Sequence, residues 1–446
     1  AARERRAAWE PLWRDCYAHA LPRRGANRPG GGTDTTYDGT AADAVEQLAA
    51  SLLAELTPPW SSWLSLEAAA GVTAAEGRSL APMLEDATRR LLAQFHRSNF
   101  AVELHQCFLD LATVGTATLA FEEAPTGAPT AFAFTAVPAD DIFVEAGPGG
   151  QVRGHFRINR LRGAELLQRY DAWRLGTELA ERLEREPERR LELVEAVLAE
   201  AQGYGYAAFV AERGDDAVLV DRGHFQTSPF ITFRWTKGAD DDGVLNPHNV
   251  RLQPGAVIPK APGSSGLTPL ETPGRFDVSD LILDDLRARI RHTLLVDRLG
   301  PVKDARMTAT EVLERSSESA RLLGAVYGRL YAELIEPLVR RALTILVRRG
   351  EVPTAVLDRR VVEARHQGPL ARAQARDDVQ HVLSWIEQTQ RLGGDAADTV
   401  DVPAVARWLA RTLGVPAELV RDGPSMATTV ADAAAAIDAL VGAADD

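Results

Sequence analysis

The sequence predicts an α+β protein that is mainly helical. In the first 60 residues, and again beyond about residue 277, apolar residues recur every three or four positions, as in helices that bury one face. Between residues 116 and 235 the pattern changes to short runs rich in β-branched and aromatic residues, separated by Gly and Pro, which predicts strands. Helices on both sides of a strand-rich middle are typical of an α+β fold.

Composition limits the classes of protein that this chain can be. It has 446 residues, 45% hydrophobic and 25% charged, so we expect about two to four domains with their own cores. No run of 18 apolar residues and no secretory signal is found, so neither a membrane span nor a leader is expected. Cys16 and Cys107 are expected to be reduced, partly buried thiols. The net charge of −13 argues against gripping nucleic acid through a basic face, but not against letting it slide past.

The first elements are predicted to be helices. An amphipathic helix runs from Trp9 to Leu21, a polar, Gly-rich loop follows over 23–36, and a second helix covers 41–56 with Asp38 or Thr40 as its N-cap. Pro58 and Pro59 end this second helix. Trp60, Trp63 and Leu66 indicate a short buried strand or turn. Two further helices are predicted at 78–97 and 100–114.

The middle of the chain is predicted to hold seven strands, at 116–122, 131–137, 142–145, 152–159, 207–211, 217–220 and 230–235. Helices are expected at 164–170 and at about 177–201. The run 181–200 is dense in Glu, Arg and Leu, which suits a solvent-facing amphipathic helix. Residues 236–274 are expected to be loop-like with short strands.

The last part of the chain is predicted to be helical again, at 277–299, from 308 to about 349, and over 367–413, followed by an Ala-rich end. Residues 308–311 (Thr-Ala-Thr-Glu) form a capping-box pattern. The apolar positions that follow are Val312, Leu323, Val326, Leu330, Leu334 and Leu338. About 40 helical residues would make a rod of roughly 60 Å, which is long for one compact domain, so we expect this stripe to pack against neighbouring subunits.

Two features could interrupt this helix. Pro337 is expected to bend it or to end its first part. The polar segment Ser316, Ser317, Glu318 and Ser319 has low helix propensity and could form a kink or a loop. The alternative to one long helix is two ordinary helices joined there.

No catalytic, cofactor-binding or metal-binding residues are predicted, so we expect a protein that is not an enzyme. The sequence has no Gly-x-x-x-x-Gly-Lys-Ser/Thr loop, no His-Glu-x-x-His and no Gly-x-Ser-x-Gly. Asp140 and Asp141 are expected in a turn or cap, and residues 147–150 (Gly-Pro-Gly-Gly) in a hairpin turn. Residues 240–242 (three Asp) are expected to be a solvated loop.

The chain resembles the head-to-tail connector, or portal, proteins of short-tailed bacteriophages. The most recognisable stretch is 307–312 (Met-Thr-Ala-Thr-Glu-Val) with Arg315, Glu318, Leu323, Gly324, Gly328, Arg329, Leu330, Glu333, Pro337, Leu338, Arg341 and 350–353. Earlier matches, in the expected order, are Trp9, Leu21, Pro22, 37–41 (Tyr-Asp-Gly-Thr-Ala), Leu48, Ala49, Leu52, 56–59, Asn99, Phe100, His105, Leu111, 115–117, Pro229, Phe230, Arg234 and Trp235. Each motif is short, but the ordered series covers about two-thirds of the chain.

The resemblance implies a portal fold with wing, stem, clip and helical crown, assembled as a ring that is usually of twelve copies. Such a ring lies at one capsid vertex, where double-stranded DNA is packaged and ejected. The implied partners are other copies of the chain, this DNA, the terminase, the tail adaptor, and capsid and scaffold proteins, without cofactor or membrane. The implied location is the virion, and the host cytoplasm during assembly.

The resemblance also divides the chain. Residues 1–235 would form the wing, 236–306 the start of the stem and the clip, 307–366 the long stem and wing helix with its return, and 367–446 the crown. The polar interruption then becomes a candidate for the channel lining, with Arg315, Ser316, Ser317, Glu318, Ser319 and Arg321. Surface or intersubunit ion pairs are the alternative role of the two arginines.

One departure from the family pattern follows Trp235. Family members continue with a Tyr-Gly-Arg-type motif and a helix, whereas this chain passes through Asp240 directly to Gly243. Either this protein lacks that helix, or a segment is missing from the sequence between about Ala239 and Gly243, and we favour the missing segment. Two other functions stay open, namely another structural oligomer such as a head-tail adaptor or scaffold, and an unrecognised hydrolase or nuclease.

Overall fold

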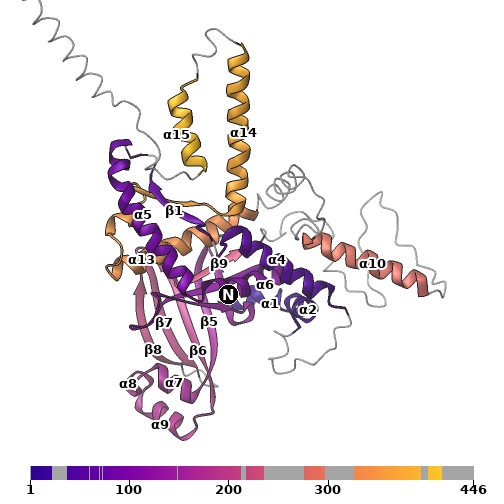
Figure 1. Cartoon of the computed structure of the whole chain (residues 1–446). Helices are drawn as coiled ribbons and strands as arrows, with labels where there is room; N and C mark the ends of the chain where they lie inside the picture. The colour runs from indigo at the N-terminus through magenta and orange to yellow at the C-terminus, as the bar shows by residue number, and fades with distance from the viewer. Residues whose placement is uncertain are drawn as a thin grey trace, which may run out of the picture. The chain divides into compact units, whose positions relative to one another are not determined.

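The structure is a computed structural model that describes residues 2–22, 38–59, 61–69, 71–72, 74–147, 149–211, 217–235, 276–296, 326–392 and 400–413 (Figure 1). The chain divides into two compact units, Ala1–His366 and Gln367–Asp446. Helices and antiparallel sheets both contribute, so the predicted α+β class is confirmed.

The predicted N-terminal helices are confirmed. They are α2 (Glu10–Ala20), α4 (Thr40–Leu56), α5 (Ala74–Arg97) and α6 (Phe100–Val114), and a short helix that was not predicted, α1 (Ala2–Ala7), precedes them. Helix α4 begins after Gly39 rather than after a side-chain N-cap. Asp38 still stabilises this end, because its Oδ1 accepts hydrogen bonds from the backbone N–H of Thr40 at 2.9 Å and from the Thr40 hydroxyl at 2.6 Å.

Three antiparallel sheets form the β part of the first unit. Strands β1 (Leu64–Ala68) and β10 (Val362–His366) pair with each other. A three-stranded sheet has the order β3 (Phe132–Val137), β2 (Thr116–Glu123), β9 (Phe230–Arg234). A five-stranded meander follows the chain order β4 (Ile142–Ala146), β5 (Val152–Arg162), β6 (Arg190–Glu200), β7 (Gly203–Ala211), β8 (Ala217–Phe225).

One predicted helix is wrong. Residues 177–201 form a short helix, α9 (Thr177–Arg185), and then the central strand β6. Pro187 cannot continue the helix, and from Arg190 the burial alternates, with Leu191, Leu193 and Val197 buried on one side. The high content of Glu, Arg and Leu in 181–200 is typical of a helix. The alternation of buried and exposed residues along 190–200 is typical of a strand.

Two predicted turns are confirmed. Asp140 and Asp141 lie in a 3₁₀ turn, Ala139–Asp141. The Gly-rich turn joins β4 to β5, where the Gly147 N–H donates to the Gln151 carbonyl at 2.7 Å. Gly149 and Gly150 have φ of 84° and 76°, which side chains disfavour. The three-Asp run at 240–242 lies outside the described residues.

The core of the first unit is rich in aromatic residues. Phe95 is a central member, with ring centroids 4.8 Å from Phe100 and 5.2 Å from Phe132. Trp63 packs on the same ring at 5.4 Å. Such tilted and edge-to-face pairs stabilise beyond the area they bury. This core joins α5, α6 and the three-stranded sheet into one body.

The later helices are α10 (Phe276–Thr293), a helix that is described from Val326 and ends with α13 (Glu336–Arg348), and the 3₁₀ turn η4 (Thr354–Leu357). The second unit contains α14 (Pro369–Leu392) and α15 (Val402–Leu413), which contact each other. The predicted helices at 277–299 and 367–413 are therefore confirmed over their described residues. Cys16 is half-buried and Cys107 is buried, where its thiol donates to the Thr118 carbonyl at 3.5 Å.

Candidate functional site

The predicted site residues fall into two groups. Arg315, Ser316, Ser317, Glu318, Ser319, Arg321, Val312 and Leu323 lie outside the described residues. Val326 is half-buried, whereas Leu330, Leu334 and Leu338 are 1%, 0% and 0% exposed. These three leucines are buried within the chain itself because their helix lies against β9. Their burial makes them core residues of one subunit, not residues that a neighbouring subunit could reach.

Pro337 neither ends the helix nor leaves it regular. The helix continues from Val326 to Arg348, but residues Tyr331–Ile335 form a π turn (η3), in which the Glu336 N–H donates to the Tyr331 carbonyl five residues back. Proline lacks an N–H and crowds the carbonyl four residues earlier, so a widened turn immediately before it relieves this conflict. Such turns often mark functional positions.

Glu333 lies in this π turn and ties three points of the chain together. Its carboxylate accepts from the Arg234 backbone N–H at 3.0 Å and from the Arg234 guanidinium at 2.6 Å. It also accepts from Arg329 Nε at 3.2 Å. The first arginine precedes residues 236–325 in the sequence and the second follows them, so one carboxylate joins the two positions that border this segment.

Arg341 is a second, buried clamp on the same helix. Its side chain is 5% exposed, and its guanidinium donates to the Phe121 carbonyl at 2.5 Å and to the Thr227 carbonyl at 2.6 Å. The rings of Phe121 and Phe225 lie 5.6 and 5.4 Å from it. Burial lowers the pKa of Arg341 to about 10, so it stays charged at neutral pH. It fixes α13 to β2 and to the β8–β9 connection.

His366 anchors the end of β10. Its Nε2 lies 2.5 Å from the Leu56 carbonyl, which can only accept, so Nε2 carries the proton. Its Nδ1 then accepts from the Tyr327 hydroxyl at 2.7 Å. Burial lowers the pKa of His366, which favours this neutral form. The contact joins α4, the long helix and β10.

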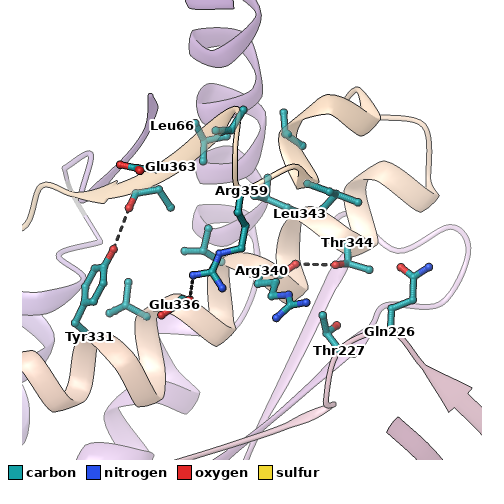
Figure 2. Close-up of a pocket in the computed structure, with 16 residues that line it drawn as sticks. Leu66, Gln226, Thr227, Tyr331, Glu336, Arg340, Leu343, Thr344, Arg359 and Glu363 are labelled. Atoms are coloured by element: carbon teal, nitrogen blue, oxygen red, sulfur yellow. Dashed lines mark hydrogen bonds and ion pairs between the residues drawn. The ribbon is translucent and has the colours of Figure 1, made fainter. Parts of the chain in front are cut away.

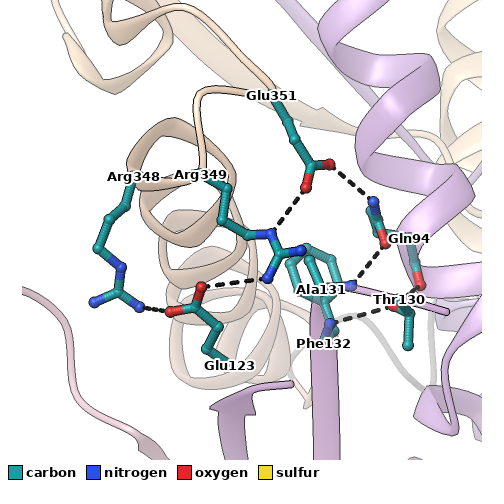
Figure 3. Close-up of polar contacts among 8 residues, drawn as sticks. All are labelled: Gln94, Glu123, Thr130, Ala131, Phe132, Arg348, Arg349 and Glu351. Atoms are coloured by element: carbon teal, nitrogen blue, oxygen red, sulfur yellow. Dashed lines mark hydrogen bonds and ion pairs between the residues drawn. The ribbon is translucent and has the colours of Figure 1, made fainter. Parts of the chain in front are cut away.

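Paired charges hold the C-terminal end of α13 (Figure 3). Glu123 of β2 contacts Arg348 and Arg349. Arg349 also pairs with Glu351 at 2.9 Å, and Glu351 accepts from Gln94 of α5. Gln94 in turn accepts from the Ala131 N–H at 2.9 Å. Strands β2 and β3, α5 and α13 are thus linked at one corner, where Gly350 ends the helix as predicted.

A cavity of about 620 Å³ lies beside α13 (Figure 2). Its walls come from α13, η4, β10, β1 and the β8–β9 connection. The walls mix apolar and polar side chains, and the charged pair Arg359–Glu336 crosses one side. Within the described residues, no group of three or more His, Cys, Asp and Glu could hold a metal ion. No helix in the described part of the chain is long and apolar enough to span a membrane.

A second cavity, of about 700 Å³, adjoins the Glu333 clamp. His155 lines it and is 4% exposed, and its Nε2 lies 3.0 Å from the Thr232 hydroxyl. The Thr232 hydroxyl also bonds the Thr118 hydroxyl at 2.7 Å. Burial lowers the pKa of His155 to about 4, so it is neutral in this network, which joins the five-stranded sheet to the three-stranded one.

The charged groups of this region each hold two or more segments in place. Glu333, Arg341 and the Arg348–Glu351 corner all tie the long helix to β-strands. These contacts fix the long helix to the strands of the first unit. The motif match alone gives Glu333 and Arg341 no role.

Comparison with known proteins identifies the family. The family model of the bacteriophage head to tail connecting protein matches residues 1–242 and 238–420. The chain belongs to this family of structural proteins, and the suspected resemblance is confirmed. The two matched segments meet at 238–242, where the sequence departs from the family pattern.

Two curated relatives agree. The chain is 22% identical over 493 residues to the "Probable portal protein" of Bordetella phage BPP-1, with 95% of this chain and 88% of the relative covered. It is 25% identical over 198 residues to the "Portal protein" of Enterobacteria phage T3, with 43% of this chain and 36% of that relative covered.

Proposed function

We propose that this chain is a portal subunit that forms a ring of copies at one capsid vertex. Double-stranded DNA is packaged and ejected through the ring, which docks the terminase and later the tail adaptor and contacts capsid and scaffold proteins. The observation that carries the proposal is the family match over most of the chain, together with relatives named as portal proteins.

The domain roles belong to the same proposal. Residues 1–235 form the wing, 236–306 the start of the stem and the clip, 307–366 the long helix and its return, and 367–446 the crown. The compact unit Gln367–Asp446 supports the last boundary. The Glu333 clamp supports the treatment of 236–325 as an excursion with both ends fixed on one body.

The channel role is assigned to Arg315, Ser316, Ser317, Glu318, Ser319 and Arg321. A channel that passes DNA must not bind it tightly, because each phosphate contact adds salt-dependent affinity. A subunit with a net charge of −13 repels the DNA backbone, and a few arginines supply weak, sequence-independent contacts.

We also propose that a segment is missing between about Ala239 and Gly243. The family matches end and restart within this stretch, which supports the idea. Peptide mass mapping of the protein isolated from particles tests it. A tryptic peptide that continues directly from Ala239 to Gly243 as written would refute the missing segment.

Mass and shape of the purified chain test the portal proposal. We expect native mass spectrometry to give a particle near twelve times 48.3 kDa, and negative-stain images to show a ring with a hole wide enough for duplex DNA. An oligomer without a hole would favour an adaptor or scaffold. A monomer with metal-dependent hydrolysis would overturn the structural assignment.

A further inference from the structure

The five-stranded sheet has one face that stays uncovered by the core clusters of the chain. The register places Ile158, Val194, Phe209 and Leu219 in one row across β5, β6, β7 and β8. Phe156, Ala196 and Ala207 form the adjacent row on the same side. Leu198 extends the patch in the next row, between Gly154 and Gly205. We name these eight apolar residues the open face.

The opposite face is covered by core residues at both ends. At one end Leu191, Leu193 and Val210 pack against the short helices α7 (Gly163–Arg169), α8 (Ala172–Leu175) and α9, which gather at that end of the sheet (Figure 1). At the other end Val197 packs against Ala120 and Phe230 of the three-stranded sheet. Both core clusters lie on this side. On the open side α1 covers the β4 edge, where Arg6 lies 3.5 Å from the ring of Phe143, the partner of Phe156.

The open face keeps contact with solvent. Leu219 is 48% and Leu198 43% exposed, and Ile158, Phe156, Val194 and Phe209 are half-buried. A sheet with one face in water normally carries polar residues on that face. A contiguous apolar surface instead marks an interaction site.

Charge narrows the kind of partner. The eight open-face residues carry no charge, and the charged residues stand at the rim. Arg160 pairs with Glu192 at 3.3 Å, and Arg222, which is paired with Ala207 in the register, and Glu200 carry one charge of each sign. Such a neutral, apolar surface does not suit DNA, which needs basic contacts. It does suit another copy of a chain whose net charge of −13 makes most of its surface repulsive to itself.

Shape points the same way. Ala196 and Ala207 lie side by side at the centre of the face, and the side chain of Leu198 lies over Gly154. A ring needs two different surfaces on each copy, one for each neighbour. A sheet face with small residues at its centre and larger apolar residues beside them can serve as one of them.

We infer that the open face binds a second copy of this chain, as one of the two surfaces that join neighbours in the ring. The inference rests on the proposed function, which requires a ring. It adds the side of the subunit that a neighbour covers, and it moves the expected contact from the buried leucines of the long helix to this sheet.

The test is a double variant that combines Leu198→Lys with Leu219→Lys, at the two most exposed residues of the open face. Both side chains point away from the core of the chain, so the fold should survive, as checked by circular dichroism and thermal unfolding. The two added lysines change the net charge from −13 to −11, which reduces the overall repulsion between copies. Weaker assembly could therefore not come from greater repulsion. The matched control is Val102→Lys with Trp173→Lys, two residues that are 64% and 74% exposed elsewhere.

Native mass spectrometry across a dilution series is the measurement. We expect wild type and control to form rings, and the open-face variant to need at least about tenfold more protein for half-assembly. Rings from all three at equal concentrations would overturn the inference and leave the portal proposal intact. Failure of the wild type to form any ring would overturn the portal proposal itself. Should the double variant unfold, Leu219→Lys alone, at the edge strand, gives the same comparison.

Discussion

Arg341 has backbone carbonyls as its principal hydrogen-bond acceptors, although it is buried. A buried cation is costly unless its hydrogen bonds are made, and here each bond also satisfies a strand or loop carbonyl. Glu333 makes the corresponding contact on the other side of Pro337, with two arginines as donors. At the level of single residues, therefore, the side chains of Glu333 and Arg341 hold the long helix against the strands.

Replacing Arg341 tests this role. Arg341→Met leaves the Phe121 and Thr227 carbonyls without their donor, so we expect the free energy of unfolding to fall by about 2–4 kcal/mol. The control is Arg340→Met, an exposed neighbour in the same helix, which should change stability by less than about 0.5 kcal/mol. Urea unfolding monitored by tryptophan fluorescence measures both. Equal midpoints for the two variants would show that the buried contacts contribute little.

His155 predicts a loss of stability in acid. Its pKa is about 4 in the folded chain, below the ordinary value of 6.5, so the unfolded chain binds a proton first as the pH falls. Stability should therefore decrease below pH 6.5, by about 2 kcal/mol between pH 7.5 and 5 from this group. His366, whose pKa burial also lowers, acts in the same direction.

Unfolding free energies at the two pH values check this. His155→Gln keeps a hydrogen-bonding group near Thr232 but cannot titrate, so the pH dependence should become weaker by about that amount. His292→Gln, at an exposed position, should leave it unchanged. An unaltered pH dependence in His155→Gln would assign the acid sensitivity to other groups.

At the scale of elements, local chemistry decided most boundaries, and tertiary packing decided the exceptions. The helix around Pro337 continues because a π turn accommodates the proline and because Leu334 and Leu338 on either side are buried. Strand β6 replaces the predicted helix because its neighbours β5 and β7 supply hydrogen-bonding partners along its length. Pairing with β5 and β7 outweighed a composition that favours helices.

Two glycines on the long helix give opposite predictions. Gly350 ends it with φ of 73°, so Gly350→Ala should destabilise by about 1 kcal/mol although no atom lies near the added methyl. Gly328 lies in the helix with open space around it, so Gly328→Ala should stabilise by about 0.5–1 kcal/mol. Thermal unfolding of the pair measures the difference, and shifts of the same sign would contradict this account.

At the scale of the whole molecule, Glu333 joins two positions that are far apart in the chain. Arg234 and Arg329 lie 95 positions apart in the numbering and share this carboxylate. The proposed channel residues lie between them in the sequence, whereas the open face belongs to the five-stranded sheet. Assembly and DNA passage should therefore be separable by mutation.

Arg321→Ala tests this separation. The ring should form normally, because the body is untouched, while the DNA packaged per particle should fall several-fold if the arginine supplies contacts that the moving DNA needs. Arg360→Ala, on the exposed surface of the first unit, is the matched control. Packaging equal to wild type in both variants would remove Arg321 from the channel lining.

The sequence alone determined the α+β class, most helices and strands, and the family, because periodicity, caps, prolines and an ordered series of motifs are local properties of the chain. The tertiary structure alone decided that 190–200 is a strand, that Leu330, Leu334 and Leu338 are core residues, and that Glu333 and Arg341 are clamps. It alone also decided which face of the five-stranded sheet stays open. Each of these depends on partners far away in the sequence, and an apolar stripe looks the same whether it is covered by its own chain or by another.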